Sequence, residues 1–372
     1  MNKPKIAVIG ANEFQDPLIR KAKEMGFEVH AFAWAAGDVG EKSADVFHPI
    51  SIVEKETICE VCKKEGVTAA CSIGSDLAIH TVNYIQRALG QPSNPPETDL
   101  IATNKYEMRK AFMAAVVPCP KFIKVVSVPA ESELAGMRYP LIVKPTDRSG
   151  SRGIFKCLNY KEVCAAVEPS CAASFEKCAI VEEYISGTEY SCESISFAGV
   201  HHVLALTKKY TTGSPHFIET GHTEPSDIPE QWQENVKSHI RMALDALHIR
   251  YGASHAEFML DGDGGVHIIE IGSRMGGDCI GSDLVYLSTG MDFMRMVVDV
   301  ACGKAPDLKP VRAPRRAEIR FIFGPEDVQG LEQTRKNAPE TLWRASEIRD
   351  MTEAVTDSSN RYGYYITMGE LL

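Results

Sequence analysis

The first part of the chain alternates short apolar runs with longer stretches in which apolar residues recur at helical spacing. Continuous apolar runs of this length are typical of strands that are buried on both faces. Strands of this kind that alternate with helices predict a parallel α/β layer. The predicted strands are residues 5–10 (KIAVIG), 28–33 and 67–73, and the predicted helices are residues 12–26 and 54–65.

A loop rich in proline and asparagine, residues 91–96 (QPSNPP), ends this layer, and a helix is predicted from Thr98 to Ala115. From Tyr139 the pattern becomes β-rich, and a second β-rich block covers residues 189–271 around a helix at 232–247. We expect four units: an α/β domain at 1–97, a unit with a glycine-rich loop at 98–183, a unit at 184–311, and a C-terminal β-containing region at 312–372.

Composition narrows the class of protein. The chain has 372 residues, of which 44% are hydrophobic, so it is long enough for two or three packed domains. Its net charge of −10, without a run of basic residues, argues against a nucleic-acid binder. The N-terminal apolar run is too short for a signal peptide, no stretch of about 18 apolar residues occurs, and eleven scattered cysteines favour reduced thiols. We therefore expect a cytoplasmic protein without a membrane partner.

Two carboxylates flank a predicted hairpin turn. Residues 258–260 and 266–269 are predicted strands around the turn sequence DGDGG at 261–265. A register that pairs Met259 with Ile268 sets Glu257 opposite Glu270, with Cβ atoms roughly 4.5–5.5 Å apart. Facing carboxylates repel each other, and hard oxygen ligands suit Mg²⁺ or Mn²⁺ shared with substrate phosphates. The alternative is a hairpin whose glutamates form salt bridges or face solvent.

A lysine precedes a glycine-rich loop. Lys144 ends the apolar strand at 140–145, and the loop that follows contains Ser149, Gly150, Ser151 and Gly153. Small residues allow backbone N–H groups to approach phosphate oxygens, and a fixed lysine behind them supplies a positive charge. The loop lacks the Gly-Lys-[Ser/Thr] of a P-loop. A plain turn remains the alternative.

An acidic linker follows the next predicted strand, in the sequence AIVEEYISGTEY at 179–190. Backbone groups at the end of such a strand can meet the edge of a base, and a carboxylate can accept hydrogen bonds from ribose hydroxyls. An exposed loop with solvated glutamates is the alternative when this segment is considered alone.

The order of these features resembles the ATP-grasp superfamily over nearly the whole chain. The resemblance implies an ATP-grasp fold preceded by a parallel α/β domain, with ATP and Mg²⁺ (or Mn²⁺) as cofactors. It implies that the nucleotide is bound by Lys105 and Lys144 at the phosphates, by the glycine-rich loop, by Glu182, Glu183, Tyr184 and Ile185 at the adenine, and by Glu189 at the ribose, and that Glu257 and Glu270 bind metal.

One position departs from the superfamily pattern. Members commonly have Glu-x-Asn-x-Arg at the final metal strand, whereas this chain has Glu270-Ile271-Gly272-Ser273-Arg274. Gly272 therefore leaves the number of metal ions open. Arg274 keeps the cation that would stabilise charge on an acyl phosphate, and Gly276 and Gly277 are expected beside the substrate.

Residues 207–225 are rich in polar and turn-forming types, which predicts a loop that faces a site. The segment is similar to one in bacilysin-type L-amino acid ligases. By that similarity, Glu219 would bind an α-ammonium group, and His222 would orient or deprotonate the attacking amine. A surface loop whose histidine caps a turn is the alternative.

The sequence thus predicts an ATP-dependent carboxylate-amine ligase that acts through an acyl phosphate and releases ADP and phosphate. Its expected partners are a small-molecule carboxylate and amine, which the sequence does not identify. The alternatives are another ATP-grasp ligation of the purine-pathway or carbamoyl-phosphate type, and an ATP-binding regulatory protein without turnover. The oligomeric state stays open, with a homodimer as one option.

Overall fold

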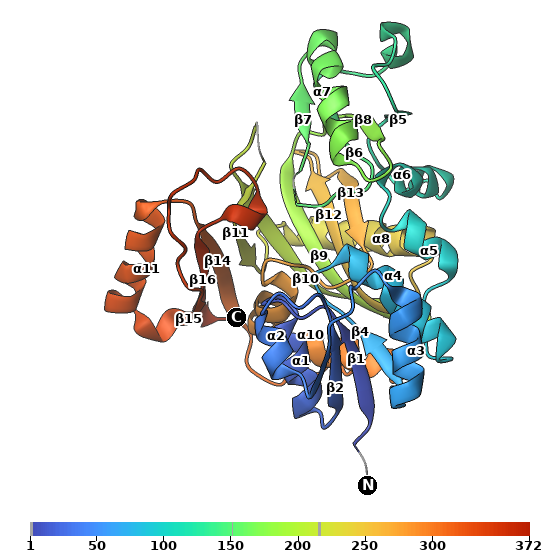
Figure 1. Cartoon of the computed structure of the whole chain (residues 1–372). Helices are drawn as coiled ribbons and strands as arrows, with labels where there is room; N and C mark the ends of the chain where they lie inside the picture. The colour runs from blue at the N-terminus through green and yellow to red at the C-terminus, as the bar shows by residue number, and fades with distance from the viewer. Residues whose placement is uncertain (1–2, 151, 215–216) are drawn as a thin grey trace.

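A computed structural model describes residues 3–150, 152–214 and 217–372, and these residues form three β-sheets (Figure 1). The N-terminal sheet is parallel, with strand order β3-β2-β1-β4. Its parallel order agrees with the prediction from the apolar runs. Its elements are β1 (Lys5–Ile9), α1 (Asp16–Glu24), β2 (Glu28–Phe32), α2 (Val39–Ser43), β3 (Val46–His48), α3 (Lys55–Glu65), β4 (Ala69–Cys71) and α4 (Asp76–Ala88).

The predicted helix at 98–115 is two helices, α5 (Pro96–Ile101) and α6 (Lys105–Ala114). The first helix ends at Ile101, and the prediction missed the break because it did not use Asn104 as the cap of the second helix. Its side chain accepts hydrogen bonds from the N–H groups of Tyr106 and Glu107. The cap places Lys105 at the first position of α6.

A four-stranded antiparallel sheet with strand order β5-β8-β6-β7 lies at the top of Figure 1, with α7 packed against it. Hydrophobic side chains of α7 and of the sheet form one core there. The elements are β5 (Phe122–Val125), η1 (Glu131–Leu134), β6 (Leu141–Pro145), β7 (Phe155–Cys157), α7 (Tyr160–Ala173) and β8 (Ala179–Glu183).

The largest sheet has eight antiparallel strands in the order β13-β12-β9-β10-β11-β14-β16-β15. Helix α8 packs on one part of it, and α11 lies beside its C-terminal strands (Figure 1). The elements are β9 (Thr188–Phe197), β10 (Val200–Thr211), β11 (Glu219–Glu224), α8 (Glu230–Ala246), β12 (Gly252–Leu260), β13 (Val266–Gly272), η2 (Ile280–Leu284), α9 (Val285–Thr289), α10 (Phe293–Ala301), β14 (Arg315–Ile322), α11 (Pro325–Asn337), η3 (Pro339–Thr341), β15 (Leu342–Ala345), η4 (Ser358–Asn360) and β16 (Gly363–Leu371).

The predicted register of the β12–β13 hairpin is wrong at its tip and right at its base. Met259 pairs with His267, not with Ile268, whereas Glu257 does pair with Glu270. A β-bulge between Glu257 and Phe258 accounts for both results, because one extra residue on β13 shifts the register beyond it.

The prediction of a loop at 207–225 is wrong for most of that segment. Residues up to Thr211 belong to β10, and β11 begins at Glu219. The two strands pair in antiparallel register, with Lys209 opposite His222. Strand pairing uses backbone groups, so polar side chains do not prevent it. This pairing brings both residues into the same layer of the molecule.

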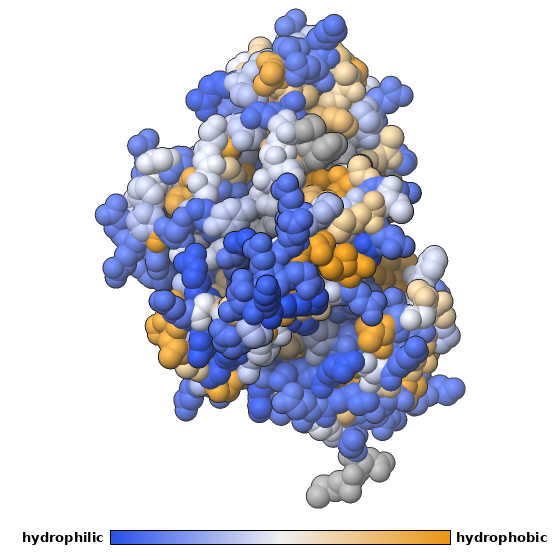
Figure 2. Space-filling view, turned by 90° about the vertical axis from the view of Figure 1, so that its left-hand side faces the viewer, coloured by the Kyte–Doolittle hydropathy of each residue, from blue (hydrophilic) through white to orange (hydrophobic). Residues whose placement is uncertain are grey.

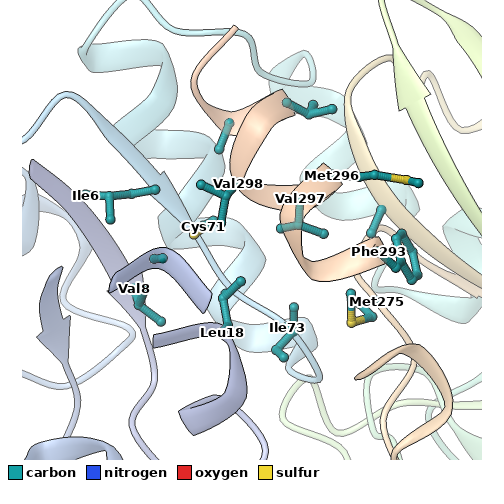
Figure 3. Packing of buried hydrophobic residues seen from close by; sticks show 14 of the residues in the cluster. Ile6, Val8, Leu18, Cys71, Ile73, Met275, Phe293, Met296, Val297 and Val298 are labelled. Atoms are coloured by element: carbon teal, nitrogen blue, oxygen red, sulfur yellow. The ribbon is translucent and has the colours of Figure 1, made fainter. Parts of the chain in front are cut away.

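A hydrophobic core joins the N-terminal sheet to the large sheet through α10 (Figure 3). Ile6, Val8 and Cys71 contribute from the N-terminal sheet, and Phe293 and Val298 contribute from α10. Close-packed interiors hold the elements around them in one arrangement. This core therefore fixes the loop between β4 and α4 against the large sheet.

The surface in Figure 2 is mainly hydrophilic, with hydrophobic residues in separate patches. None of the helices that the structure describes is long and apolar enough to cross a membrane.

Candidate active site

A cavity of about 520 Å³ is lined by strands of the large sheet, by the segments that follow β4 and β6, by the start of α6 and by Ser358 near the C-terminus. Walls with several charged and polar side chains suit a polar ligand. The predicted site residues that line the cavity are Lys105, Ser149, Gly150, Glu219, His222, Glu257, Glu270, Arg274 and Gly277.

Other predicted residues lie outside the lining of this cavity. Ser151 falls outside the described residues, so its position is not assigned. The described residues that do not line the cavity are Lys144, Gly153, Glu182, Glu183, Tyr184, Ile185, Glu189 and Gly276.

The two facing glutamates each bind a lysine. Lys209 Nζ lies 2.5 Å from Glu257 Oε1, and Lys105 Nζ lies 2.7 Å from Glu270 Oε1. Lys209 also lies 2.9 Å from Glu189 Oε1 and 3.8 Å from Glu219 Oε1. Burial disfavours the charged form of Lys209, but these carboxylates raise its pKa well above the usual value. Lys209 thus lies within 4 Å of three carboxylates, so this group of four side chains has an excess of negative charge.

The glutamate pair fits a divalent cation. Each carboxylate is about a quarter exposed in the cavity, at 25% for Glu257 and 26% for Glu270. Among the described residues, the Oε2 atom of neither glutamate accepts a hydrogen bond, which leaves one oxygen of each for a hard cation. The described part of the chain gathers no group of three His, Cys, Asp or Glu side chains for one ion. Further ligands would therefore come from substrate phosphate oxygens or water.

Lys144 and Glu182 form a buried ion pair with each other, at 2.5 Å between Nζ and Oε1. Arg109 completes the group, with its Nε 3.1 Å from Glu182 Oε2. Burial is the largest influence on Lys144 and lowers its pKa from the usual value. For Glu182, burial raises the pKa, but the charges of Arg109 and Lys144 have the larger effect and lower it below the usual value. The negative charge of Glu182 is therefore already compensated by protein cations.

The residues after Glu182 also have protein partners. Glu183 accepts a hydrogen bond from the N–H of Arg138 at 2.9 Å. The ammonium of Lys156 lies over the Tyr184 ring at 3.6 Å from its centre. Ile185 is half-buried.

Close packing requires a glycine at position 153. Its φ is +69°, and a Cβ there would lie 3.1 Å from both Pro145 Cγ and Ala173 Cβ. The end of the glycine-rich loop thus packs between β6 and α7, while Ser149 and Gly150 face the cavity.

Arg274 pairs with Asp76 at the start of α4, at 2.8 Å (Nε to Oδ1) and 3.2 Å (Nη2 to Oδ2). Although burial raises the pKa of Asp76, Arg274 lowers it. A Cβ at Gly272 would lie 2.8 Å from Asp76 Oδ1 and 3.1 Å from Arg274 Nε. The missing side chain at position 272 therefore makes room for this pair.

Gly276 packs against a buried pair formed by Glu193 and His255. Its N–H donates to Glu193 Oε2 at 2.9 Å, and a Cβ at Gly276 would lie 2.5 Å from Glu193 Oε1. Burial disfavours the imidazolium, but the charge of Glu193 and its hydrogen bond raise the pKa of His255 to about 9. The ring also lies 3.4 Å (Nε2) from Glu257 Oε1, so a cation supports this carboxylate from behind.

His222 is 1% exposed and lines the cavity, and neither of its ring nitrogens has a hydrogen-bond partner among the described residues. Its Nε2 lies 3.7 Å from Asp278 Oδ2. Glu219 accepts a hydrogen bond from Ser358 Oγ at 2.7 Å. A buried polar group without a partner is costly unless a ligand or water completes it.

Sequence reasoning gave no role to several residues of the cavity. Lys209 lies in the segment for which the sequence predicts a loop. Interpreted as a strand, the same segment would place Lys209 on one face of the sheet and Lys208 on the other. Asp76 follows a predicted buried strand at the carboxyl edge of a parallel sheet, a position that often faces ligands. Asp278 and Ser358 have no local signal, because distant segments bring them to the cavity.

Comparison with known proteins identifies the fold and the domain. An L-amino acid ligase from Bacillus licheniformis superposes with a TM-score of 0.82 at 22% identity, over 99% of this chain and 94% of that chain. A phosphoribosylglycinamide synthetase from Anaerococcus prevotii gives 0.78 at 19% identity, over 100% and 95%. The chain has the fold of these two enzymes. Residues 137–282 match the model of the ATP-grasp domain family, so this chain contains an ATP-grasp domain. The predicted ATP-grasp fold is thereby confirmed.

Curated relatives share part of the sequence. An alanine–anticapsin ligase from Bacillus subtilis is 26% identical over 308 residues, which cover 73% of this chain and 64% of the relative. A D-alanine–D-alanine ligase from Aromatoleum aromaticum is 26% identical over 207 residues, which cover 54% of this chain and 65% of the relative. The chain matches less than two thirds of the length of either relative.

Proposed function

We propose that this protein is an ATP-dependent ligase that joins a carboxylate to an amine, with amino acids as the substrates. The observation that carries the proposal is the facing pair Glu257 and Glu270 in a cavity that also contains Lys105 and Lys209. Paired carboxylates with nearby lysines suit a metal-bound triphosphate. The relatives named as ligases of amino acids support the substrate class.

The nucleotide would occupy the side of the cavity near the glycine-rich loop. Ser149 and Gly150 would offer backbone N–H groups to phosphate oxygens, and Lys105 would supply a positive charge. Glu257 and Glu270 would hold Mg²⁺, which would supply positive charge against the phosphates. The other proposed contacts of the nucleotide are Lys144, residues 182–185 and Glu189. Lys144 could contact a phosphate only if its ion pair with Glu182 were partly released.

The reaction would begin with transfer of the γ-phosphoryl group of ATP to the substrate carboxylate. An amine would then attack the acyl phosphate, release phosphate and form an amide. Arg274 would stabilise the developing negative charge, Gly277 would line the substrate, and Glu219 would hold an ammonium group. His222 lines the cavity, and its ring nitrogens have no hydrogen-bond partner among the described residues, so it is suited to orient the amine or accept its proton.

We also propose that the chain divides into units after residues 97, 183 and 311. The α/β unit comes first, the two ATP-grasp units follow, and a C-terminal cap ends the chain. A small-molecule carboxylate and amine are the proposed partners.

The test is a screen of amino-acid pairs for nucleotide products with Mg·ATP. We expect ADP and phosphate in amounts equal to the amide, because the acyl-phosphate route consumes one γ-phosphoryl group per bond. Chromatography of the products measures both. AMP with pyrophosphate would instead indicate adenylation, and ATP binding without turnover on any pair would favour the regulatory alternative. ADP release with bicarbonate or a purine precursor, but not with amino acids, would favour another ATP-grasp ligation.

A further inference from the structure

Three segments that are far apart in the sequence meet at one part of the cavity wall. Glu219 begins β11, Asp278 lies in the loop after β13, and Ser358 begins η4 near the C-terminus. All three side chains belong to residues that line the cavity. Since no local pattern connects them, some contact must hold them together.

Arg361 makes that contact with each of the three. Its Nη1 and Nη2 donate to the two oxygens of Asp278 at 2.9 and 2.5 Å. Its Nε donates to the carbonyl oxygen of Ser358 at 2.9 Å, and Nη1 donates to that of Glu219 at 3.3 Å. A planar guanidinium is suited to such a fork of acceptors. The side chain is only 7% exposed, so it is committed to these partners.

The surroundings of Arg361 hold it in place. Its guanidinium lies 3.6 Å from the centre of the Phe321 ring on β14. The same ring meets the His222 ring edge to face, with 5.7 Å between their centres. Among the described residues, its partners are three residues of the cavity wall and this one aromatic ring.

Asp278 has a backbone conformation that needs such support. Its φ is +51°, and that of the next residue, Cys279, is +60°. Non-glycine residues in the left-handed region cost free energy and persist only when their surroundings hold them. The bidentate pair with Arg361 is a contact that can hold this turn, and it directs the Asp278 carboxylate toward His222.

The charges of this wall define the group that it can bind. Glu219 and Asp278 are both carboxylates, and His222 offers a ring nitrogen without a partner. Arg361 offsets one negative charge, and Lys209 is shared with Glu189 and Glu257 and reaches Glu219 only at 3.8 Å. An ammonium group would complete the wall, because it supplies hydrogen-bond donors and a positive charge.

We propose that Arg361 is a positioning residue that builds the ammonium-binding wall of the substrate cavity, so that the C-terminal segment sets affinity for the amino-acid substrate. The inference rests on the proposed ligase function and adds to it a residue outside the matched ATP-grasp domain. The contacts of Arg361 would then affect binding of the amino acid but not binding of ATP.

The experiment compares Arg361→Met, Arg361→Lys and Ser358→Ala with the control Arg349→Ala. Arg349 donates to the carbonyl oxygen of Ser359 in the same segment, but it does not line the cavity. The probe is the amino-acid pair that releases most ADP from the unmodified protein. KM for each amino acid and KM for ATP are measured by ADP release, and thermal melts report folding.

We expect Arg361→Met to raise KM for one amino acid by about tenfold or more, as loss of a charge-assisted contact predicts, with KM for ATP changed by less than about twofold. Arg361→Lys should keep part of the affinity, because a lysine retains the charge but not the fork. Ser358→Ala should raise the same KM by a few fold, since it removes only the hydrogen bond to Glu219. Arg349→Ala should leave both constants unchanged.

An Arg361→Met variant that folds and keeps the amino-acid KM would overturn the inference, as would an equal rise of both KM values. If Arg361→Met does not fold, Arg361→Lys and Ser358→Ala decide by the same two constants. Failure of the proposed function is a separate result: the unmodified protein would then release no ADP with any amino-acid pair.

Discussion

Two clusters of lysine and glutamate lie in or near the same cavity, and their carboxylates differ in exposure to it. In the open cluster, Glu257 and Glu270 pair with Lys209 and Lys105, and both carboxylates are about a quarter exposed in the cavity. In the closed cluster, Glu182 lies between Lys144 and Arg109 and is 3% exposed. The lysines are buried in both clusters.

The difference teaches that residue type alone does not separate a binding group from a structural ion pair. A carboxylate that keeps one free oxygen at a cavity can exchange its lysine for a metal ion or lend that lysine to a phosphate. A carboxylate that is surrounded by two cations is already neutralised, and removing that carboxylate leaves buried positive charge without its anion.

The largest expected effect comes from Glu270→Gln set against Glu182→Gln. We expect Glu270→Gln to fold and to lose at least about 100-fold in kcat/KM, or about 2.7 kcal/mol, because the pair is proposed to bind Mg²⁺ as two anions. Glu182→Gln should instead lose about 3–5 kcal/mol of unfolding free energy, since Arg109 and Lys144 would be left without their anion. Denaturant unfolding and steady-state kinetics measure the two quantities. Similar losses of stability in both variants would remove the distinction between the clusters.

A smaller effect is expected from Lys105→Met and Lys144→Met. Lys105 lines the cavity, so its loss should weaken Mg·ATP binding by about 10- to 100-fold, the value of a charge-assisted hydrogen bond. Lys144 is held by Glu182, so its replacement should weaken binding less and lower stability more. Calorimetric titration with ATP gives the affinities, and melts give the stabilities. A greater loss of affinity for Lys144→Met would mean that ATP recruits the closed cluster.

The smallest effect concerns Gly272→Ala. The new methyl group would lie 2.8 Å from Asp76 Oδ1 and would displace the pair with Arg274. We expect kcat to fall by about tenfold while ATP affinity stays within about twofold, because Arg274 is proposed to act on the acyl phosphate. Ala256, which is buried on β12 and pairs with Ile271, offers a control as Ala256→Gly, since it changes one methyl group without adding an atom beside Asp76. An unchanged kcat for Gly272→Ala would show that Arg274 does not depend on Asp76.

Local patterns predicted much of the fold. The apolar runs at 5–10 and 28–33 are strands of a parallel sheet, and the turn sequence at 261–265 connects a hairpin in which Glu257 faces Glu270. These features depend on residues close in sequence, namely hydrophobic periodicity and turn chemistry. The order of motifs also indicated the ATP-grasp fold.

Other predictions from the sequence were wrong for identifiable reasons. The break at Asn104 is a cap inside a helical pattern, and the bulge next to Glu257 shifts a register without a sequence signature. The polar segment 207–225 forms strands because its neighbours β9 and β14 supply partners for its backbone. For the hairpin register and the polar segment, a local preference was weaker than the contact that the fold provided, whereas the cap at Asn104 is itself a local contact.

The sequence by itself determined the succession of elements, the facing glutamates and the glycine-rich loop, because each is encoded within a few neighbouring residues. Only the tertiary structure decided that Asp76 binds Arg274, that Lys209 serves three carboxylates, and that Arg361 joins distant parts of the cavity wall. Those contacts depend on how sheets and segments pack. Burial and distance, which turn a charged residue into a structural partner or a binding group, exist only once the chain has folded.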